Sequence, residues 1–341
     1  MKRSRIVIRA DADSAIGMGH VVRCLTLARE LTEHGAEVHL AAKSLPEVLE
    51  QRASDLGVTL WMLRPGPDDE ATLEILSRLS PVDMVIVDHY GLDEAWEQAV
   101  RPRVARLMVI DDLASRAHCC DVLLDQNYAA PGVNRYQGLV PVTATLWLGP
   151  SYALIRREFP AARAKRREQA DAIRTIAVSF GGFASPELVR CVVDACALRP
   201  LSTYFAGGTL HVFGAAQDSR SNGDYSFKVC EHRFSGNMAG YLADSDLAIG
   251  AGGGGLWERL CIGVPSMVTI LADNQRPGVE ALAKDGYLVN LGDASRLDAT
   301  GLCNAICALR DEPGVLHGLF ERGRRLVDGE GARRVAAMLL Q

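Results

Sequence analysis

Short apolar runs of strand character alternate with helical runs along almost the whole chain, and this alternation limits the possible folds most. The run RIVIRA (5–10) has strand character, and the next run (20–35) places its apolar residues at helical spacing and ends at a glycine. The run VDMVIVDHY (82–90) is apolar on both faces at its centre, which is typical of a strand inside a parallel sheet. Strand, helix and strand at this spacing predict right-handed crossovers and an open parallel sheet.

The alternation is interrupted once, near the middle of the chain. Residues 151–171 are charged and lack strand character, and the strand pattern resumes with IRTIAVSF (173–180). The sequence therefore predicts an α/β protein with two Rossmann-like open parallel-sheet domains, residues 1–160 and 171–341, facing a central cleft. Ligands of such sheets bind beyond the carboxyl ends of the strands, where loops and helix starts converge.

A run of glycines joins a strand to a helix in the second half. The strand 246–249 leads into Gly250, then Gly252–Gly255, and a helix is expected to begin near Leu256. Glycines let the backbone approach a bulky anion, and free N–H groups at a helix start bind phosphate oxygens, so the run favours a diphosphate over a plain flexible turn. The spacing matches neither a Walker A loop nor a dinucleotide fingerprint. Glu258, one turn into the helix, is either a partner of a ribose diol or an exposed helix glutamate.

A histidine occupies the corresponding turn in the first half. Gly17 and Gly19 precede His20 where the first strand gives way to a helix. The positive end of a helix disfavours imidazolium, so His20 is expected to be neutral and able to accept a proton. Asp11 and Asp13 are close enough in sequence to orient the ring or a water molecule. A histidine that caps the helix or fills a niche is the alternative.

Polar side chains gather after several other expected strands. They fall at residues 88–90, 111–112, 125–127 and 273–275. Each group has a structural explanation as a helix cap or turn, and only their repeated placement at one edge of each sheet favours a function.

Composition excludes several classes of function. The net charge of −5 gives no general attraction for nucleic acid or acidic membranes, and the basic cluster at 163–167 is interpreted as part of a linker. The nine cysteines include no C-x-x-C pair, which predicts reduced thiols in a cytoplasmic protein and no zinc site. The first residues lack the apolar core of a signal peptide, and no run reaches the ~18 apolar residues of a membrane span. We expect no cofactor, no metal and no membrane insertion, and a monomer.

Seven blocks between Arg9 and Gln275 together carry a family resemblance. They are RADAD…IGMGHVVRCLTLA, IVDHYGLD, VIDDLA, LLDQNY, LGPSYALIRREF, VSFGG and GAGGGGLWERLCIGVPSMVTILADNQ. In this order they resemble the UDP-2,4-diacetamido-2,4,6-trideoxy-β-L-altropyranose hydrolases of pseudaminic acid biosynthesis. That family is similar to the MurG-type glycosyltransferases of GT-B architecture, and spore-coat polysaccharide proteins look alike.

The resemblance implies that the second domain binds UDP and that the first carries the sugar site and the catalytic histidine. His20 matches the residue that activates water, and Tyr90 and Asn274 match further active-site positions. The expected substrate contacts are Arg9, Asp11, Gly17, Gly19, Phe234, Gly252, Gly253, Gly254, Gly255, Glu258 and Gln275.

The chain departs from the family pattern at two places. The glycine loop of the family usually carries Ser or Thr where this chain has Gly254 and Gly255, which leaves backbone N–H groups to bind the diphosphate. The acidic residue that commonly follows SFGG is replaced by residues 183–185, Phe-Ala-Ser.

The reaction that the resemblance implies is hydrolysis of a UDP-sugar. Water attacks the anomeric carbon with inversion, His20 takes its proton, and UDP leaves. A MurG-like glycosyltransferase with the same UDP site and a non-catalytic sensor of nucleotide sugars are the alternatives.

Overall fold

The chain forms two units, residues 1–156 with 330–341, and residues 157–329. The structure is a computed structural model that describes residues 3–13, 16–130, 132–168, 171–181, 185–214, 224–232 and 236–341. None of the described helices is long and apolar enough to cross a membrane.

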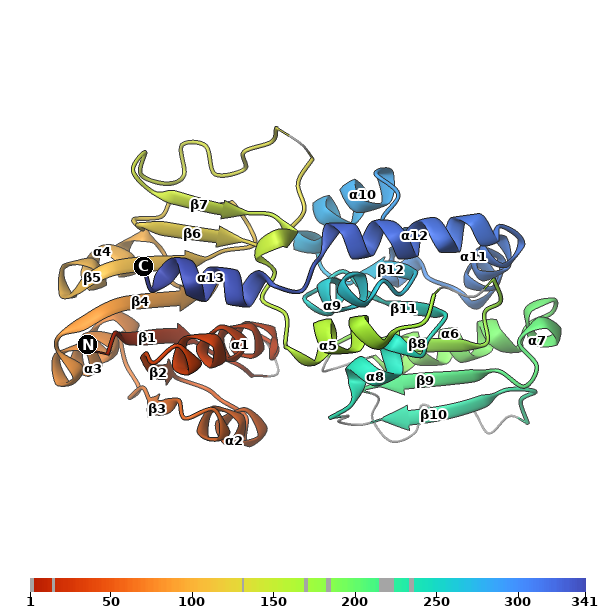
Figure 1. The fold of residues 1–341 in the computed structure, drawn as a ribbon, viewed down its shortest axis with the longest axis horizontal. Coiled ribbons are helices and arrows are strands. Elements are labelled where there is room, and N and C mark those ends of the chain that lie inside the picture. The colour runs from red at the N-terminus through yellow and green to blue at the C-terminus, as the bar shows by residue number, and fades with distance from the viewer. Residues whose placement is uncertain are drawn as a thin grey trace. The chain divides into compact units, whose positions relative to one another are not determined.

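The first unit is built on a sheet of seven parallel strands in the order β3-β2-β1-β4-β5-β6-β7 (Figure 1). The strands are β1 (Arg5–Ala10), β2 (Glu37–Ala42), β3 (Thr59–Met62), β4 (Val82–Asp88), β5 (Val104–Ile110), β6 (Val122–Asp125) and β7 (Thr145–Leu148). The helices are α1 (Gly19–Glu33), α2 (Glu47–Asp55), α3 (Asp68–Leu79), α4 (Glu94–Val100) and α13 (Gly331–Leu339), with short 3-10 turns at Arg101–Arg103 and Pro150–Tyr152.

Alternate side chains of the central strands enter two separate cores. Ile6 and Ile8 of β1 pack on the face that α1, α2 and α13 cover, whereas Val7 packs on the face that α3 and α4 cover. This burial on both faces confirms the parallel sheet that the apolar runs predict. The expected stop of the first helix is also confirmed, because α1 ends at Glu33 and Gly35 has a φ of +89°.

The second unit repeats the plan with six parallel strands in the order β10-β9-β8-β11-β12-β13. The strands are β8 (Thr175–Ser179), β9 (Thr209–Phe213), β10 (Lys228–His232), β11 (Leu247–Ala251), β12 (Ser266–Ile270) and β13 (Val289–Asp293). The helices are α5 (Glu158–Lys165), α6 (Pro186–Ala197), α7 (Leu201–Tyr204), α8 (Met238–Ala243), α9 (Gly255–Ile262), α10 (Arg276–Lys284), α11 (Ala299–Asp311) and α12 (Pro313–Leu326), with 3-10 turns at Asp273–Gln275 and Ala294–Arg296.

The two ends of the expected second domain need correction. The last helix, α13, belongs to the first unit, where the blue end of the chain lies among red and orange elements (Figure 1). Its residues Ala332, Val335, Ala336 and Leu339 join the core around α1. Helix α5, expected to be part of a linker, belongs to the second unit, because Phe159 is fully buried there and Arg163 donates to the carbonyl oxygens of Cys261 and Val327.

Each sheet has a point where the strand order reverses direction. In the first unit it lies between β1 and β4, whose last residues Ala10 and Asp88 are partners, and in the second between β8 and β11. Loops at the carboxyl ends of strands at such a point form the usual ligand site of an open α/β sheet. The turn before His20 and the segment that holds Tyr90 follow β1 and β4, and the glycine run follows β11.

Candidate functional site

The candidate site of the first unit is the histidine cluster, made of His20, Arg23, Asp88, Tyr90 and Asp112. His20 lies in the first turn of α1, and its ring is 7% exposed. Nδ1 lies 2.6 Å from Oδ1 of Asp88, and the ring meets Tyr90 edge-on at a centroid distance of 4.5 Å. Asp88, rather than Asp11 or Asp13, is the carboxylate that holds the ring.

Arg23 holds the Asp88 carboxylate from the other side. Its Nε and Nη2 each donate to Asp88 at 2.6 Å, and its Nη1 donates to both oxygens of Asp112 at 2.9 Å. Burial alone would raise the pKa of Asp88, but Arg23 and His20 outweigh it and hold the pKa well below its usual range. Because an ionised carboxylate only accepts hydrogen bonds, the network assigns the proton of a neutral His20 ring to Nδ1 and the lone pair to Nε2. Within the described ranges, the hydrogen bonds of this ring run through Nδ1 alone.

Tyr90 is the exposed member of the histidine cluster. The hydroxyl donates to Oδ2 of Asp112 at 3.1 Å, and the residue is 41% exposed. Burial of the hydroxyl and the charge of Asp112 raise the pKa of Tyr90 well above its ordinary value, so the group stays a neutral hydrogen-bond donor. The structure thus brings two of the three predicted catalytic residues, His20 and Tyr90, into direct contact.

Arg9 and Asp11 do not fit their expected role as substrate contacts. Arg9 is fully buried, and its guanidinium donates to Asp68 at 2.6 and 3.0 Å and to Asp11 at 2.7 Å. Asp11 also accepts from the backbone N–H of Lys43 and lies 3.3 Å from Nε2 of His89. Both charges have partners inside the unit, and these contacts brace the end of β1.

The turn before His20 has the shape that its glycines require. Gly17 has a φ of +82°, which side chains rarely adopt, and its N–H donates to the carbonyl oxygen of Asp13. A Cβ added at Gly17 or Gly19 would meet no atom of the described residues within 4 Å. The turn therefore leaves open space beside the start of α1.

The candidate site of the second unit is the glycine loop, Gly252–Gly255 with Gly250 before it. The expected strand-to-helix junction is confirmed, since β11 ends at Ala251 and α9 begins at Gly255. A Cβ at Gly250 would lie 2.2 Å from the carbonyl oxygen of Ser179, and one at Gly252 would lie 2.5 Å from Val279. At Gly253, Gly254 and Gly255 a Cβ would meet no atom closer than 3.8 Å in the part of the chain that the structure describes. The loop is thus packed against its own unit at its start and open over its last three glycines.

Two other predicted residues of the second unit, Gln275 and Glu258, lie close to this loop, and Asn274 precedes Gln275 in the chain. Gln275 packs on it, with Cβ 3.3 Å from the Cβ position of Gly252, and its Oε1 accepts from the N–H of Leu271. The Oε2 of Glu258 lies 3.9 Å from the Cβ position of Gly255. Asn274 is exposed in the 3-10 turn before α10. Phe234 lies outside the described residues.

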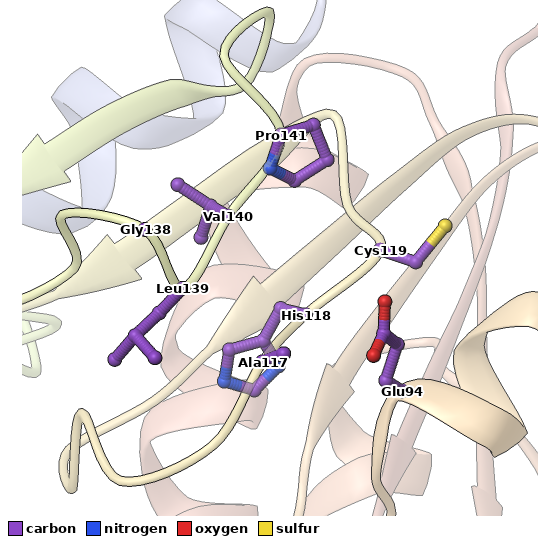
Figure 2. A pocket seen from close by; sticks show the side chains of 8 residues that line it. All are labelled: Glu94, Ala117, His118, Cys119, Gly138, Leu139, Val140 and Pro141. Carbon is purple, nitrogen blue, oxygen red and sulfur yellow. The ribbon is translucent and has the colours of Figure 1, made fainter.

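A separate cavity of about 270 Å³ lies in the first unit and contains none of the predicted site residues. Figure 2 shows the thiol of Cys119 and the carboxylate of Glu94 on one side of it, with Val140 and Pro141 on the other. Among the described residues, no group of three or more His, Cys, Asp and Glu side chains is arranged to hold a metal ion.

His118, at the edge of this cavity, predicts a pH dependence of stability. Burial would lower the pKa of His118, but the carboxylates of Asp111 and Glu97 outweigh it and raise the pKa to about 9 from 6.5. The extra stability is therefore fully present below pH 6.5 and lost as the pH rises through about 9. The wild type should be more stable than His118→Gln, as measured by the free energy of urea unfolding. This difference between the two proteins should be larger at pH 6 than at pH 10 by about 3 kcal/mol. A difference that does not change with pH would contradict this assignment.

The chain has sequence relatives of 25–29% identity. No protein-family model matches the chain. The chain is 25% identical over 340 residues to the spore coat polysaccharide biosynthesis protein SpsG of Bacillus subtilis (strain 168), which covers 97% of this chain and 96% of the relative. It is 29% identical over 167 residues to the UDP-2,4-diacetamido-2,4,6-trideoxy-β-L-altropyranose hydrolase of Campylobacter jejuni, which covers 48% of this chain and 57% of the relative.

Solved structures of the same architecture span the whole chain. MurG of Acinetobacter baumannii superposes with a TM-score of 0.72 at 14% identity and covers 99% of both chains. The glycotransferase of kitacinnamycin superposes with a TM-score of 0.67 at 18% identity, again over 99% of both. The fold is therefore GT-B, and the chain is similar in sequence to SpsG and to the UDP-diacetamido-trideoxyaltropyranose hydrolase that its motifs resemble.

Proposed function

We propose that this chain is an enzyme that acts on a UDP-sugar, and that its reaction is hydrolysis at the anomeric carbon. The contact of His20 with Asp88 and Arg23 is the observation that carries the proposal, since it provides an oriented base at the switch point of the first sheet. Sequence similarity to the Campylobacter jejuni hydrolase supports this reaction, with UDP-2,4-diacetamido-2,4,6-trideoxy-β-L-altropyranose as the first candidate substrate.

His20 is the general base of the proposed mechanism. The oxygen of a water molecule bonds to the anomeric carbon while a proton of that water passes to Nε2 of His20. His20 becomes an imidazolium, and Asp88 stabilises this charge by accepting the hydrogen bond from Nδ1–H. The bond from the anomeric carbon to the phosphate oxygen breaks, and UDP leaves with the electron pair. Attack from the face opposite UDP inverts the anomeric centre.

The glycine loop is the proposed site of the leaving diphosphate. No described atom lies closer than 3.8 Å to a Cβ position at its last three glycines, and we assign the N–H groups of these glycines to the negative charge that grows as UDP departs. Glu258 is assigned to the ribose hydroxyls and Gln275 to the diphosphate side of the loop. Asn274 and Tyr90 keep the active-site assignment that the resemblance implies, and the contact between Tyr90 and the His20 ring supports the assignment of Tyr90.

A glycosyltransferase is the second candidate function, and the likeness of the fold to MurG favours it. In that reaction the same His20 would take the proton of an acceptor hydroxyl in place of water. The two reactions differ in whether an acceptor is needed.

Incubation with a panel of UDP-sugars, followed by NMR, tests the proposal. We expect UDP and free sugar to form without any added acceptor, with the inverted anomer appearing first. Turnover only in the presence of an acceptor would replace the hydrolase by the transferase. Binding of UDP-sugars without turnover under either condition would indicate a sensor.

A further inference from the structure

A buried arginine, Arg259, lies next to the glycine loop. Arg259 is on α9, one turn after the loop, and is 2% exposed. Its Nη1 lies 2.8 Å from the position that a Cβ at Gly250 would take and 3.8 Å from that of one at Gly255. The guanidinium is therefore close to Gly250, before the loop, and to Gly255 at its end.

Arg259 forms no ion pair within 4.0 Å among the described residues. Its hydrogen bond goes from Nη2 to the carbonyl oxygen of Ala251 at 2.6 Å, and its buried Nε has no hydrogen-bond partner. Burial lowers the pKa of Arg259 to about 10, against a smaller opposing effect of Glu258, so the group remains charged at neutral pH. The buried Arg23 of the first unit, in contrast, contacts two carboxylates. A buried charge without a counter-ion is costly unless an anion approaches it.

We propose that Arg259 is the fixed counter-charge of the diphosphate and increases the affinity of the loop for phosphate groups. This inference rests on the proposed binding of UDP at the same loop. Gly254 and Gly255 supply no side-chain donors, so the loop itself offers only neutral N–H groups. The positive charge opposite the diphosphate is that of the buried Arg259 guanidinium. An uncompensated charge also acts over several ångströms in a dry interior, so direct contact with the ligand is not required.

Titration of UDP, UMP and uridine into the protein and into Arg259→Met tests the proposal. We expect the affinity for UDP to fall about 10- to 100-fold in the variant, while that for uridine stays within about twofold. The thermal midpoint without ligand should be unchanged or higher, because an apolar chain replaces a buried charge with no counter-ion. Arg259→Lys, which keeps the charge, should recover part of the UDP affinity.

Arg166→Met is a matched control in the same unit. The Arg166 guanidinium donates to the carbonyl oxygens of Leu242, Ala243 and Ser245 near the end of α8. This variant should unfold at a lower temperature and keep the wild-type ratio of UDP to uridine affinity.

Two results would overturn the role of Arg259. One is equal loss of UDP and uridine affinity in Arg259→Met together with a lower thermal midpoint, since that pattern marks a structural arginine. The other is unchanged UDP affinity in a folded variant. Failure of the wild-type protein to bind UDP would instead reject the proposed function, and titration with inorganic pyrophosphate would still show whether Arg259 strengthens anion binding.

Discussion

Replacement of His20 by asparagine should lower the turnover of a UDP-sugar by about 100-fold or more and leave the affinity for UDP unchanged. The asparagine amide can take the place of Nδ1 and still donate to Asp88, so the buried carboxylate keeps a partner. It has no group in the position of Nε2, so it cannot accept the proton of the attacking water. Initial rates of UDP release and titration with UDP measure the two quantities separately.

His34→Asn is the matched control, because it makes the same substitution at the other end of the same helix. His34 is the exposed residue after α1, and its Nδ1 lies 2.7 Å from the carbonyl oxygen of Glu30. Its turnover should equal that of the wild type. If His20→Asn kept turnover within about fivefold of the wild type, His20 would not be the base.

Much of the fold follows from local patterns that act over one element at a time. Within the run 20–35, the apolar residues at helical spacing are all buried: Val21, Leu25, Ala28 and Leu31. Helix α9 begins one residue before the expected Leu256, and β11 ends two residues after the expected position 249. The destination of α13 could not be predicted in this way. Its apolar face has the same pattern whichever sheet it covers, and only the packed structure shows that it returns to the first.

The site is predictable where a backbone requirement marks it and much less so where partners come from distant strands. Gly17, Gly250 and Gly252 are visible in sequence because Gly17 has a positive φ and a Cβ at Gly250 or Gly252 would collide with its neighbours. The pairing of His20 with Asp88 depends on β4 lying beside β1, a strand order that single-sequence patterns do not specify.

The sequence gives no reliable role for two arginines of the first unit: Arg23 belongs to the histidine cluster but was not predicted there, and Arg9 was predicted to contact substrate but is buried. Arg23 lies three residues after His20, on the same face of α1, and a charge on that face was the available signal for the missed partner of Asp88. Arg9 was expected to contact substrate, but a strand interior buries it completely against Asp68 and Asp11.

Asp88→Asn should be the most destabilising substitution in the histidine cluster, by about 3–5 kcal/mol. Asp88 is fully buried, and its two oxygens accept from His20, from Arg23 and from the thiol of Cys24. An amide at this position removes the charge opposite Arg23 and turns one acceptor into a donor that faces other donors. Turnover should fall as well, because the ring of His20 loses the carboxylate that fixes its tautomer and stabilises its charged form.

The dependence on pH separates this ion pair from ordinary packing. Since the pKa of Asp88 is lowered in the folded protein, its stabilisation is present above the usual carboxyl value of 3.8 and is lost as the pH falls below it. The difference in unfolding free energy between wild type and Asp88→Asn should therefore be constant from about pH 5 to 8 and shrink below about pH 4. Urea titration followed by tryptophan fluorescence measures this difference, because Trp61, Trp96 and Trp147 all lie in the first unit.

Asp93→Asn is the control variant. Asp93 is the N-cap of α4, where asparagine caps equally well, so this change should leave stability and turnover unchanged. An equally small effect of Asp88→Asn at neutral pH would show that the carboxylate does not hold the cluster together.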